Sequence, residues 1–339
     1  MSDPGQTQRP TPERIFQALN GYQLTAALKA AIELEIFTAI GGGADMAAVI
    51  ASRCQASERG VRILCDYLVV HGFLTKSGKG YGLAPDAAVF LDRRSHTYIG
   101  ACTGFLTSPF IRGEFDRLVE AVRKGGTMMG PEGSMAPDHP MWVEFARSMA
   151  PLQGLMAETV AKVIGVDPAA KCKVLDIAAG HGMFGVTVAR HNPNAEIYAV
   201  DWSGVLDVAK ENAERAGVSS RFHAIPGDAF RVEFGSDYDL VLLANFLHHF
   251  DPAAIEKFMR KTHAALKSGG RAVTLEFIPN EDRISPPFPA AFGVIVLATT
   301  AGGDAYTFAE YEQMFRRAGF AENELRVLPS THGVIISRK

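Results

Sequence analysis

Carboxylates stand at the ends of three successive apolar runs in this sequence. Asp176 ends a β-branched run and precedes a turn of small residues, Asp201 ends the next run, and Asp228 follows the third. Such runs predict strands, and the carboxyl ends of parallel strands form the edge at which doubly wound sheets bind ligands. We therefore expect the three carboxylates to face one ligand. An acid at the end of the second strand suits a ribose, whose two hydroxyl groups donate to it.

The turn after Asp176 narrows the choice of ligand. Gly180 and Gly182 precede a helical pattern at 184–191, so a strand, a tight turn and a helix N-terminus follow one another. A dinucleotide turn would place a pyrophosphate here, and Asp176 would repel it. A carboxylate favours a cation, such as an amino group or a sulfonium. Asp228 and Phe230 suit the amino group and ring face of an adenine.

Ribose, adenine and a cation together predict S-adenosylmethionine as the cofactor, and NAD fits less well. The residues predicted to bind it are Asp176, Ala178, Gly180, Gly182, Asp201, Trp202, Asp228, Ala229, Phe230 and Asn245.

Four motifs resemble those of a known family. Residues 175–182 are similar to the pattern L-D-x-G-x-G-x-G, with Ala178 in place of the first glycine. Residues 227–230 match G-D-x-F, 247–250 resemble L-H-D-W with two replacements, and 302–311 match G-G-x-x-x-T-x-x-E-[FY]. From about residue 12 onward the chain resembles the S-adenosylmethionine-dependent O-methyltransferases with an N-terminal winged-helix dimerisation domain, of the plant phenolic and bacterial natural-product type. The resemblance implies a homodimeric methyltransferase.

The resemblance also implies a general base. It places His248, after the fourth predicted strand, in that role and Glu276 beside it. An unperturbed phenol has a pKa of about 10, so a base with a pKa near 7 helps to ionise it. A second acid of the family falls at Ala305, which weakens the argument. His248 therefore has two interpretations, as a base or as a structural residue that caps the helix near Pro252 or simply packs there.

Large apolar side chains on two segments predict the acceptor pocket. These residues are Trp142, Phe145, Met149, Met156, Phe288, Phe292 and Ile295. Methionine and phenylalanine side chains on both sides of the cofactor domain indicate a flat, apolar acceptor. We predict methylation of a hydroxyl group on an aromatic small molecule by in-line displacement. Transfer to carbon, sulfur or nitrogen stays open.

The elements that must position these residues alternate from residue 171 onward. Strands are predicted at 173–178, 195–201, 220–226, 237–244 and 270–278, with helices between them. This order predicts an α/β fold with a Rossmann-like, doubly wound parallel sheet. Two last strands, 323–328 and 332–338, resemble the antiparallel hairpin that ends the family's sheet. We expect three parts: a winged-helix dimerisation domain at 1–100, a helical linker and acceptor-pocket segment at 101–170, and the methyltransferase domain at 171–339.

The N-terminal part has its own pattern. A helical period runs over 13–40, helices follow at 46–53 and 57–71, and a strand, turn and strand span 72–83. This order predicts a winged helix, which raises the alternative of a cofactor-sensing regulator that binds DNA. Arg59, Arg62 and two lysines are few for a duplex-binding surface. The apolar helical pattern at 13–40 favours dimerisation instead.

Composition sets further limits. The 339 residues carry a formal net charge of −3, so neither nucleic acid nor an anionic membrane is an expected partner. The four cysteines are scattered, no metal-ligand spacing occurs, and we expect neither a disulfide framework nor a metal site. Residues 1–10 are polar and lack the apolar core of a signal peptide. We therefore expect a cytoplasmic protein.

Overall fold

The computed structural model describes residues 10–339. The polar start of the chain, where we expected no signal peptide, lies outside this range apart from Pro10. Two compact units separate between Thr103 and Gly104, so the predicted middle segment, 101–170, falls almost entirely in the larger unit. No helix of residues 10–339 has the length and apolar character to cross a bilayer.

The smaller unit combines helices with a two-stranded hairpin. Its elements are α1 (Glu13–Leu19), α2 (Gly21–Glu33), α3 (Ile36–Gly41), α4 (Ala47–Arg53), α5 (Glu58–Val70), β1 (Leu74–Ser77), β2 (Gly80–Leu83), α6 (Pro85–Phe90) and the 3₁₀ turn η1 (Gly100–Cys102). Helices α4 and α5 and the hairpin occur in the predicted order. The helical pattern at 13–40 forms three helices, because Asn20 ends α1 and Glu35 adopts a left-handed conformation with φ 57°.

The larger unit contains a seven-stranded sheet. Its strands are β3 (Cys172–Ile177), β4 (Ala195–Asp201), β5 (Phe222–Pro226), β6 (Tyr238–Ala244), β7 (Leu266–Glu276), β8 (Glu322–Val327) and β9 (Gly333–Arg338). Their order is β5-β4-β3-β6-β7-β9-β8, with β3 to β7 parallel and β8 and β9 antiparallel. The predicted α/β fold with a doubly wound sheet is confirmed. The strand order reverses between β3 and β6, the point at which such sheets bind ligands.

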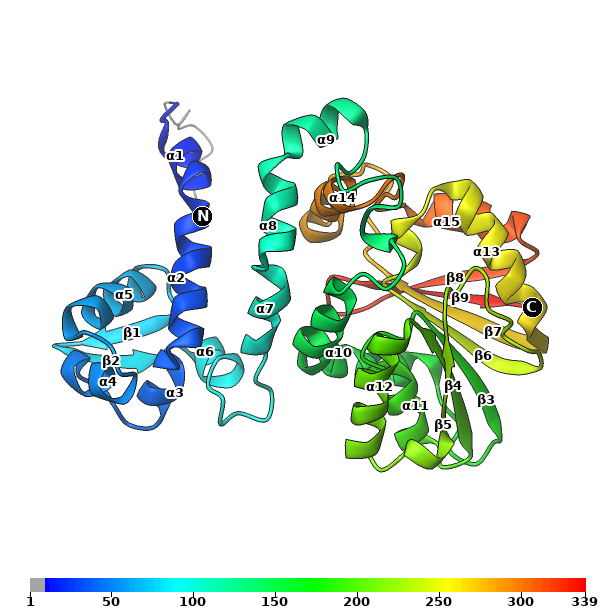
Figure 1. The fold of residues 1–339 in the computed structure, drawn as a ribbon, viewed down its shortest axis with the longest axis horizontal. Helices are drawn as coiled ribbons and strands as arrows, with labels where there is room; N and C mark the ends of the chain where they lie inside the picture. The colour runs from blue at the N-terminus through cyan, green and yellow to red at the C-terminus, as the bar shows by residue number, and fades with distance from the viewer. Residues whose placement is uncertain (1–9) are drawn as a thin grey trace, which may run out of the picture. The chain divides into compact units, whose positions relative to one another are not determined.

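Helices cover both faces of the sheet (Figure 1). One face carries α10 (Met141–Ile164), α11 (Met183–His191) and α12 (Ser203–Arg215), and the other carries α13 (Pro252–Ala265) and α15 (Phe308–Arg317). Strands covered on both faces need apolar side chains in both directions, and Val174, Leu175 and Ile177 of β3 are fully buried.

A third set of helices lies beyond the carboxyl edge of the sheet. It comprises α7 (Thr103–Leu106), α8 (Pro109–Asp116), α9 (Leu118–Lys124), the 3₁₀ turn η2 (Gly133–Met135) and α14 (Pro287–Thr299). Helix α14 packs against α8 and α9. Two more 3₁₀ turns, η3 (Ser219–Arg221) and η4 (Leu247–His249), follow α12 and β6. The helices beyond the sheet and the turn η4 enclose the space above the strand ends.

Candidate active site

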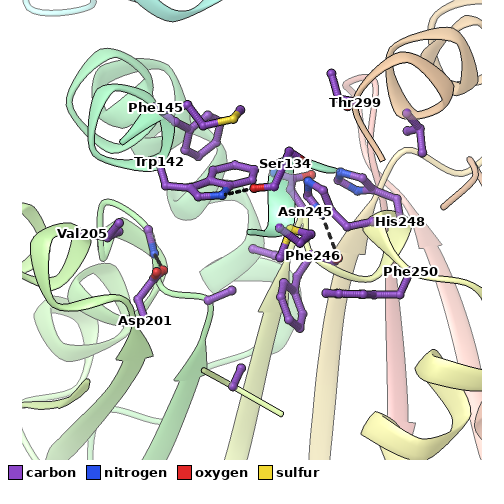
Figure 2. A pocket seen from close by; sticks show the side chains of 18 of the residues that line it. Ser134, Trp142, Phe145, Asp201, Val205, Asn245, Phe246, His248, Phe250 and Thr299 are labelled. Atoms are coloured by element: carbon purple, nitrogen blue, oxygen red, sulfur yellow. Dashed lines mark hydrogen bonds between the residues drawn. The ribbon is translucent and has the colours of Figure 1, made fainter. Parts of the chain in front are cut away.

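A cavity of about 760 Å³ opens at the carboxyl ends of β3, β4 and β6. The residues that line it run from Phe105 to His332, all in the larger unit. Figure 2 shows Asp201 and His248 on opposite sides of this cavity, with Trp142 and Phe145 between them on a third side. The cavity therefore has a polar end near β4 and a second end near η4.

The turn after β3 approaches the cavity through its backbone. Gly180 lines the cavity with φ 56°, and a Cβ atom built there would meet no heavy atom nearer than 3.9 Å. Ala178 also lines it, in the left-handed region with φ 51°. Gly182 does not line the cavity. A Cβ atom on Gly182 would lie 2.9 Å from Cβ of Ala209, so this glycine lets the turn pack against α12.

Asp176 and Asp201 have different positions, although both were predicted to face the cofactor. Asp176 lies beneath the turn, does not line the cavity, and accepts a hydrogen bond from the backbone N–H of Gly185 at 2.9 Å. Burial raises its pKa to about 7. Asp201 lines the cavity, and burial raises its pKa to about 6. Its carboxylate accepts from the N–H groups of Gly180 at 2.8 Å and Trp202 at 2.7 Å. Asp201 can therefore meet a ligand, whereas Asp176 shapes the turn.

The other predicted cofactor residues also line the cavity: Trp202, Asp228, Ala229, Phe230 and Asn245. Asn245 has φ 53°, and its buried carboxamide oxygen has no hydrogen-bond partner within residues 10–339. A buried polar atom without a partner is costly, which indicates that a ligand supplies one. With Asp201 as an acceptor and the open backbone at Gly180, these residues fit a nucleoside ligand.

His248 and Glu276 form a buried pair at the other end of the cavity. Nδ1 of His248 lies 2.6 Å from Oε2 of Glu276, and His248 lines the cavity. Oε1 of Glu276 accepts from the backbone N–H groups of Phe246 at 3.0 Å and Leu247 at 2.8 Å. Because the carboxylate accepts the hydrogen of Nδ1, Nε2 is the nitrogen that remains for the cavity. Glu276 thus fixes the tautomer of His248 without the second acid that the family has at the position of Ala305.

The alternative role of His248 as a helix cap does not agree with the structure. The side chain of Asp251 caps α13, accepting from the N–H of Ala254 at 2.9 Å. Ala305 is buried, and the neighbouring Asp304 forms an ion pair with Arg283 at 3.2 Å. Within residues 10–339, Glu276 is therefore the one acidic partner of His248.

Aromatic and aliphatic side chains line much of the cavity. Six of the seven predicted pocket residues are among them: Trp142, Phe145, Met149, Phe288, Phe292 and Ile295. Nε1 of Trp142 donates to the carbonyl oxygen of Ser134 at 2.8 Å, which anchors the 133–135 turn (Figure 2). The ring of Phe292 meets the ring of His248 edge to face, with centroids 4.9 Å apart.

Met156 is the predicted pocket residue that does not line the cavity. It lies two helical turns beyond Met149 on α10 and packs against the core cluster on that face of the sheet. The periodicity of the sequence placed Met149 and Met156 on one helix face, but it does not predict how far along the helix the cavity extends.

Sequence reasoning missed several residues of the cavity. Three further histidines line it, His181, His249 and His332, and burial lowers the pKa of each. His332 and Gln153 each hold a buried polar atom without a partner in the described part of the chain. His181 and His249 stand inside the motifs at 175–182 and 247–250, so their positions in those motifs could have indicated them. His332 belongs to none of the motifs, and no sequence signal indicated it.

Comparisons with known proteins agree with this geometry. The fold and the cavity define a Rossmann-like methyltransferase with a separate N-terminal helical unit. The O-methyltransferase domain family matches residues 117–321, and the O-methyltransferase dimerisation domain family matches residues 16–93. The chain belongs to the O-methyltransferase family and is a methyltransferase whose cofactor is S-adenosylmethionine, as the sequence predicted.

Individual relatives extend over nearly the whole chain. The 3-hydroxy-5-methyl-1-naphthoate 3-O-methyltransferase of Streptomyces sahachiroi is 28% identical over 97% of this chain and 95% of its own length. A crystal structure from Nostoc punctiforme, assigned as an O-methyltransferase, is 51% identical with a TM-score of 0.93, over 98% of this chain and 100% of that one. Human N-acetylserotonin methyltransferase in complex with SAM has a TM-score of 0.83 at 20% identity, covering 98% of this chain and 99% of that one, and shows the fold.

Proposed function

We propose that this enzyme methylates a hydroxyl group of a flat aromatic small molecule, with His248 as the general base and Glu276 as the residue that positions it. The observation that carries the proposal is the 2.6 Å contact between His248 and Glu276 at the edge of an aromatic cavity. Because Glu276 pairs with Nδ1, Nε2 can take the proton of the hydroxyl group that is to be methylated.

Each residue has a separate task in the proposed reaction. S-adenosylmethionine, when bound, supplies an activated methyl group, so the protein mainly aligns the reactants and removes one proton. Asp201 and Asn245 would hold the cofactor, and the backbone at Gly180 leaves room for it. Nε2 of His248 takes the proton of the acceptor hydroxyl group. Glu276 keeps the imidazole in the required tautomer and favours the positive charge that it gains.

The walls of the cavity support an aromatic acceptor. Trp142, Phe145 and Phe292 present ring faces and edges, which fit a flat ring at low entropic cost. The Streptomyces sahachiroi relative is named for a naphthoate acceptor, which is consistent with this choice. A hydroxyl group is favoured over a carbon, sulfur or nitrogen acceptor because the oriented base would serve a weakly acidic O–H group.

The alternative of a DNA-binding regulator finds no support in the smaller unit. Arg62 and Lys76, two of its few candidate phosphate contacts, both form ion pairs with Asp66. We infer instead that this unit joins two copies of the chain, because α1 has no buried residue and the matched family is a dimerisation domain. The cytoplasmic location stays a prediction.

Transfer of a labelled methyl group to panels of phenols, thiols and amines tests the proposal. We expect turnover with phenols, and His248→Ala to reduce it by roughly 10²–10⁴ while S-adenosylhomocysteine still binds. His191→Ala, which removes a surface histidine paired with Glu158, is the matched control. Near-normal turnover of His248→Ala with every phenol, or a preference for thiols or amines, would contradict the proposal.

A further inference from the structure

A second histidine of the cavity has no role in the reaction described above. His332 precedes β9, lines the cavity, and is 7% exposed. Its Nδ1 lies 3.2 Å from Oγ1 of Thr331, and its Nε2 is buried without a hydrogen-bond partner within residues 10–339. A buried ring nitrogen left unpaired is unfavourable for folding, so its retention needs an explanation.

Aromatic contacts place His332 on the same wall as His248. The ring of His332 packs on Phe277 with centroids 3.9 Å apart, and Phe277 packs on Phe292 at 4.0 Å. Phe292 in turn meets the ring of His248 at 4.9 Å. These contacts join the two imidazoles through one continuous surface, and all four side chains line the cavity. An aromatic acceptor lying on this wall would reach both histidines.

The electrostatic setting of His332 restricts what it can recognise. Burial lowers its pKa to about 4, so the imidazole is neutral at physiological pH. The only arginine or lysine that the described chain contributes to the cavity lining is Arg231, and it pairs with Asp228 at 3.3 Å. No fixed cation therefore lies beside His332 to bind a carboxylate. The ligand group that remains for Nε2 is an uncharged oxygen. A hydroxyl group can pair with either tautomer of the ring, and a carbonyl oxygen can accept from the Nε2–H tautomer.

We propose that His332 is a specificity-determining residue, which hydrogen-bonds a second, uncharged oxygen of the acceptor while His248 faces the oxygen to be methylated. This inference rests on the proposed function and narrows its substrate class to neutral aromatic compounds with two oxygen substituents. His332 supplies one hydrogen bond and no proton transfer.

Naphthols that differ only in their second substituent test the inference. The probes are 2-naphthol, the isomeric dihydroxynaphthalenes and the hydroxynaphthoates, measured by methyl transfer and by calorimetric binding to the complex with S-adenosylhomocysteine. For the wild type we expect at least one dihydroxynaphthalene to exceed 2-naphthol in kcat/KM by about tenfold, because one buried hydrogen bond is gained. The corresponding hydroxynaphthoate should not show this gain.

Substitutions of His332 test whether its Nε2 causes the preference for a dihydroxynaphthalene over 2-naphthol. His332→Phe keeps a ring against Phe277 and should abolish the roughly tenfold preference, mainly through KM, whereas His332→Gln should retain part of it. S-adenosylhomocysteine affinity should stay within about twofold, and the melting temperature should change little, because the lost contact with Thr331 is offset by removal of an unpaired buried nitrogen. His263→Phe, at a histidine that packs on Phe320 outside the cavity lining, is the matched control and should keep the preference.

The outcomes separate this inference from the proposed function. If 2-naphthol is a substrate and no dihydroxynaphthalene surpasses it, or if His332→Phe keeps the preference, the inference is wrong and the proposed function stands. A loss of kcat for every acceptor in His332→Phe would show a role in the chemical step or in folding, and would also overturn the inference. If S-adenosylhomocysteine binds but neither the naphthols nor the panel of phenols is methylated, the proposed function is wrong as well.

Discussion

At the scale of single residues, the turn after β3 contains an unfavourable backbone conformation. Ala178 has φ 51°, at the position where the family pattern has glycine. A side chain in the left-handed region costs about 1–2 kcal/mol, and the extra freedom of glycine in the unfolded chain offsets about half of that. Ala178→Gly should therefore raise the free energy of unfolding by about 0.5–1 kcal/mol, measured by urea denaturation of the cofactor-free protein.

The neighbouring alanine offers the control for this prediction. Ala179 is 4% exposed and is not among the residues with positive φ. Ala179→Gly should lower the stability by about 0.5–1 kcal/mol or more, because it adds chain entropy and removes a buried methyl group. Equal effects of the two substitutions would show that the conformation at Ala178 stores no strain.

We predict that Asp201 makes cofactor binding dependent on pH. Its pKa of about 6 in the free protein means that it gains a proton as the pH falls through this value. The protonated form is the poorer acceptor for ribose hydroxyl groups, so affinity for S-adenosylhomocysteine should fall below pH 6, by up to about tenfold at pH 5.

Calorimetry between pH 5 and 8 measures this dependence, and Asp201→Asn is the reference variant. At pH 8 this variant should bind S-adenosylhomocysteine more weakly than the wild type, by about tenfold or more, because it loses charge-assisted hydrogen bonds. Its affinity should vary less with pH, and any remaining slope would belong to another group such as Asp176, whose pKa is about 7. Identical pH profiles for the two proteins would remove Asp201 from the binding site.

At the scale of elements, Glu276 at the end of β7 organises η4. Its carboxylate is fully buried and joins three backbone N–H groups to the His248 ring. In Glu276→Gln the amide N–H would donate to Nδ1 and place the ring hydrogen on Nε2, the wrong tautomer for a base. We expect turnover to fall by roughly 10²–10³, with S-adenosylhomocysteine affinity kept, because Glu276 does not line the cavity.

Initial rates and calorimetry on the same samples check this prediction. Glu281→Gln is the control, since Glu281 is an exposed acid in the loop that follows β7. Its turnover should equal that of the wild type. Normal turnover of Glu276→Gln would mean that His248 needs no carboxylate, and that alignment of the reactants suffices.

The sequence predicted elements better than side-chain directions. The apolar runs that form β3, β4 and β6 are buried on both faces, so the strands and the ligand-binding edge followed from pattern alone. Strand pattern did not reveal that Asp176 points beneath the turn toward Gly185 while Asp201 faces the cavity. That difference depends on how α11 begins, which only the packed structure fixes.

Two further features of the structure could not be predicted from the sequence. The pattern at 13–40 is apolar at helical spacing throughout, yet Glu35 adopts a left-handed conformation that no propensity signals. His332 enters the cavity because the β8–β9 hairpin returns the chain beside β7, a contact between residues far apart in sequence. Motifs with a fixed spacing were predictable, whereas residues joined by tertiary structure alone were not.

At the scale of the whole molecule, the two units carry different tasks. Every residue that lines the cavity belongs to the larger unit, within the part of the chain that the structure describes. The smaller unit has a core of its own, around Ile36, Phe37 and Leu68, but α1 contributes nothing to it. Ile15, Phe16, Leu19 and Tyr22 are each 59–69% exposed. A row of exposed apolar side chains on one short segment marks a surface for another protein.

We predict that this surface joins two identical chains. The wild type should sediment as a dimer at micromolar concentration. Phe16→Glu with Leu19→Glu should give a folded monomer, because both side chains are exposed in the protomer and only the stabilisation from association is lost. In a two-fold interface each substitution occurs twice, and burying unpaired carboxylates costs several kcal/mol each. Val327→Glu, at an 81% exposed valine on β8, is the control and should stay dimeric. A monomeric wild type, or a double variant that remains dimeric, would exclude α1 from the interface.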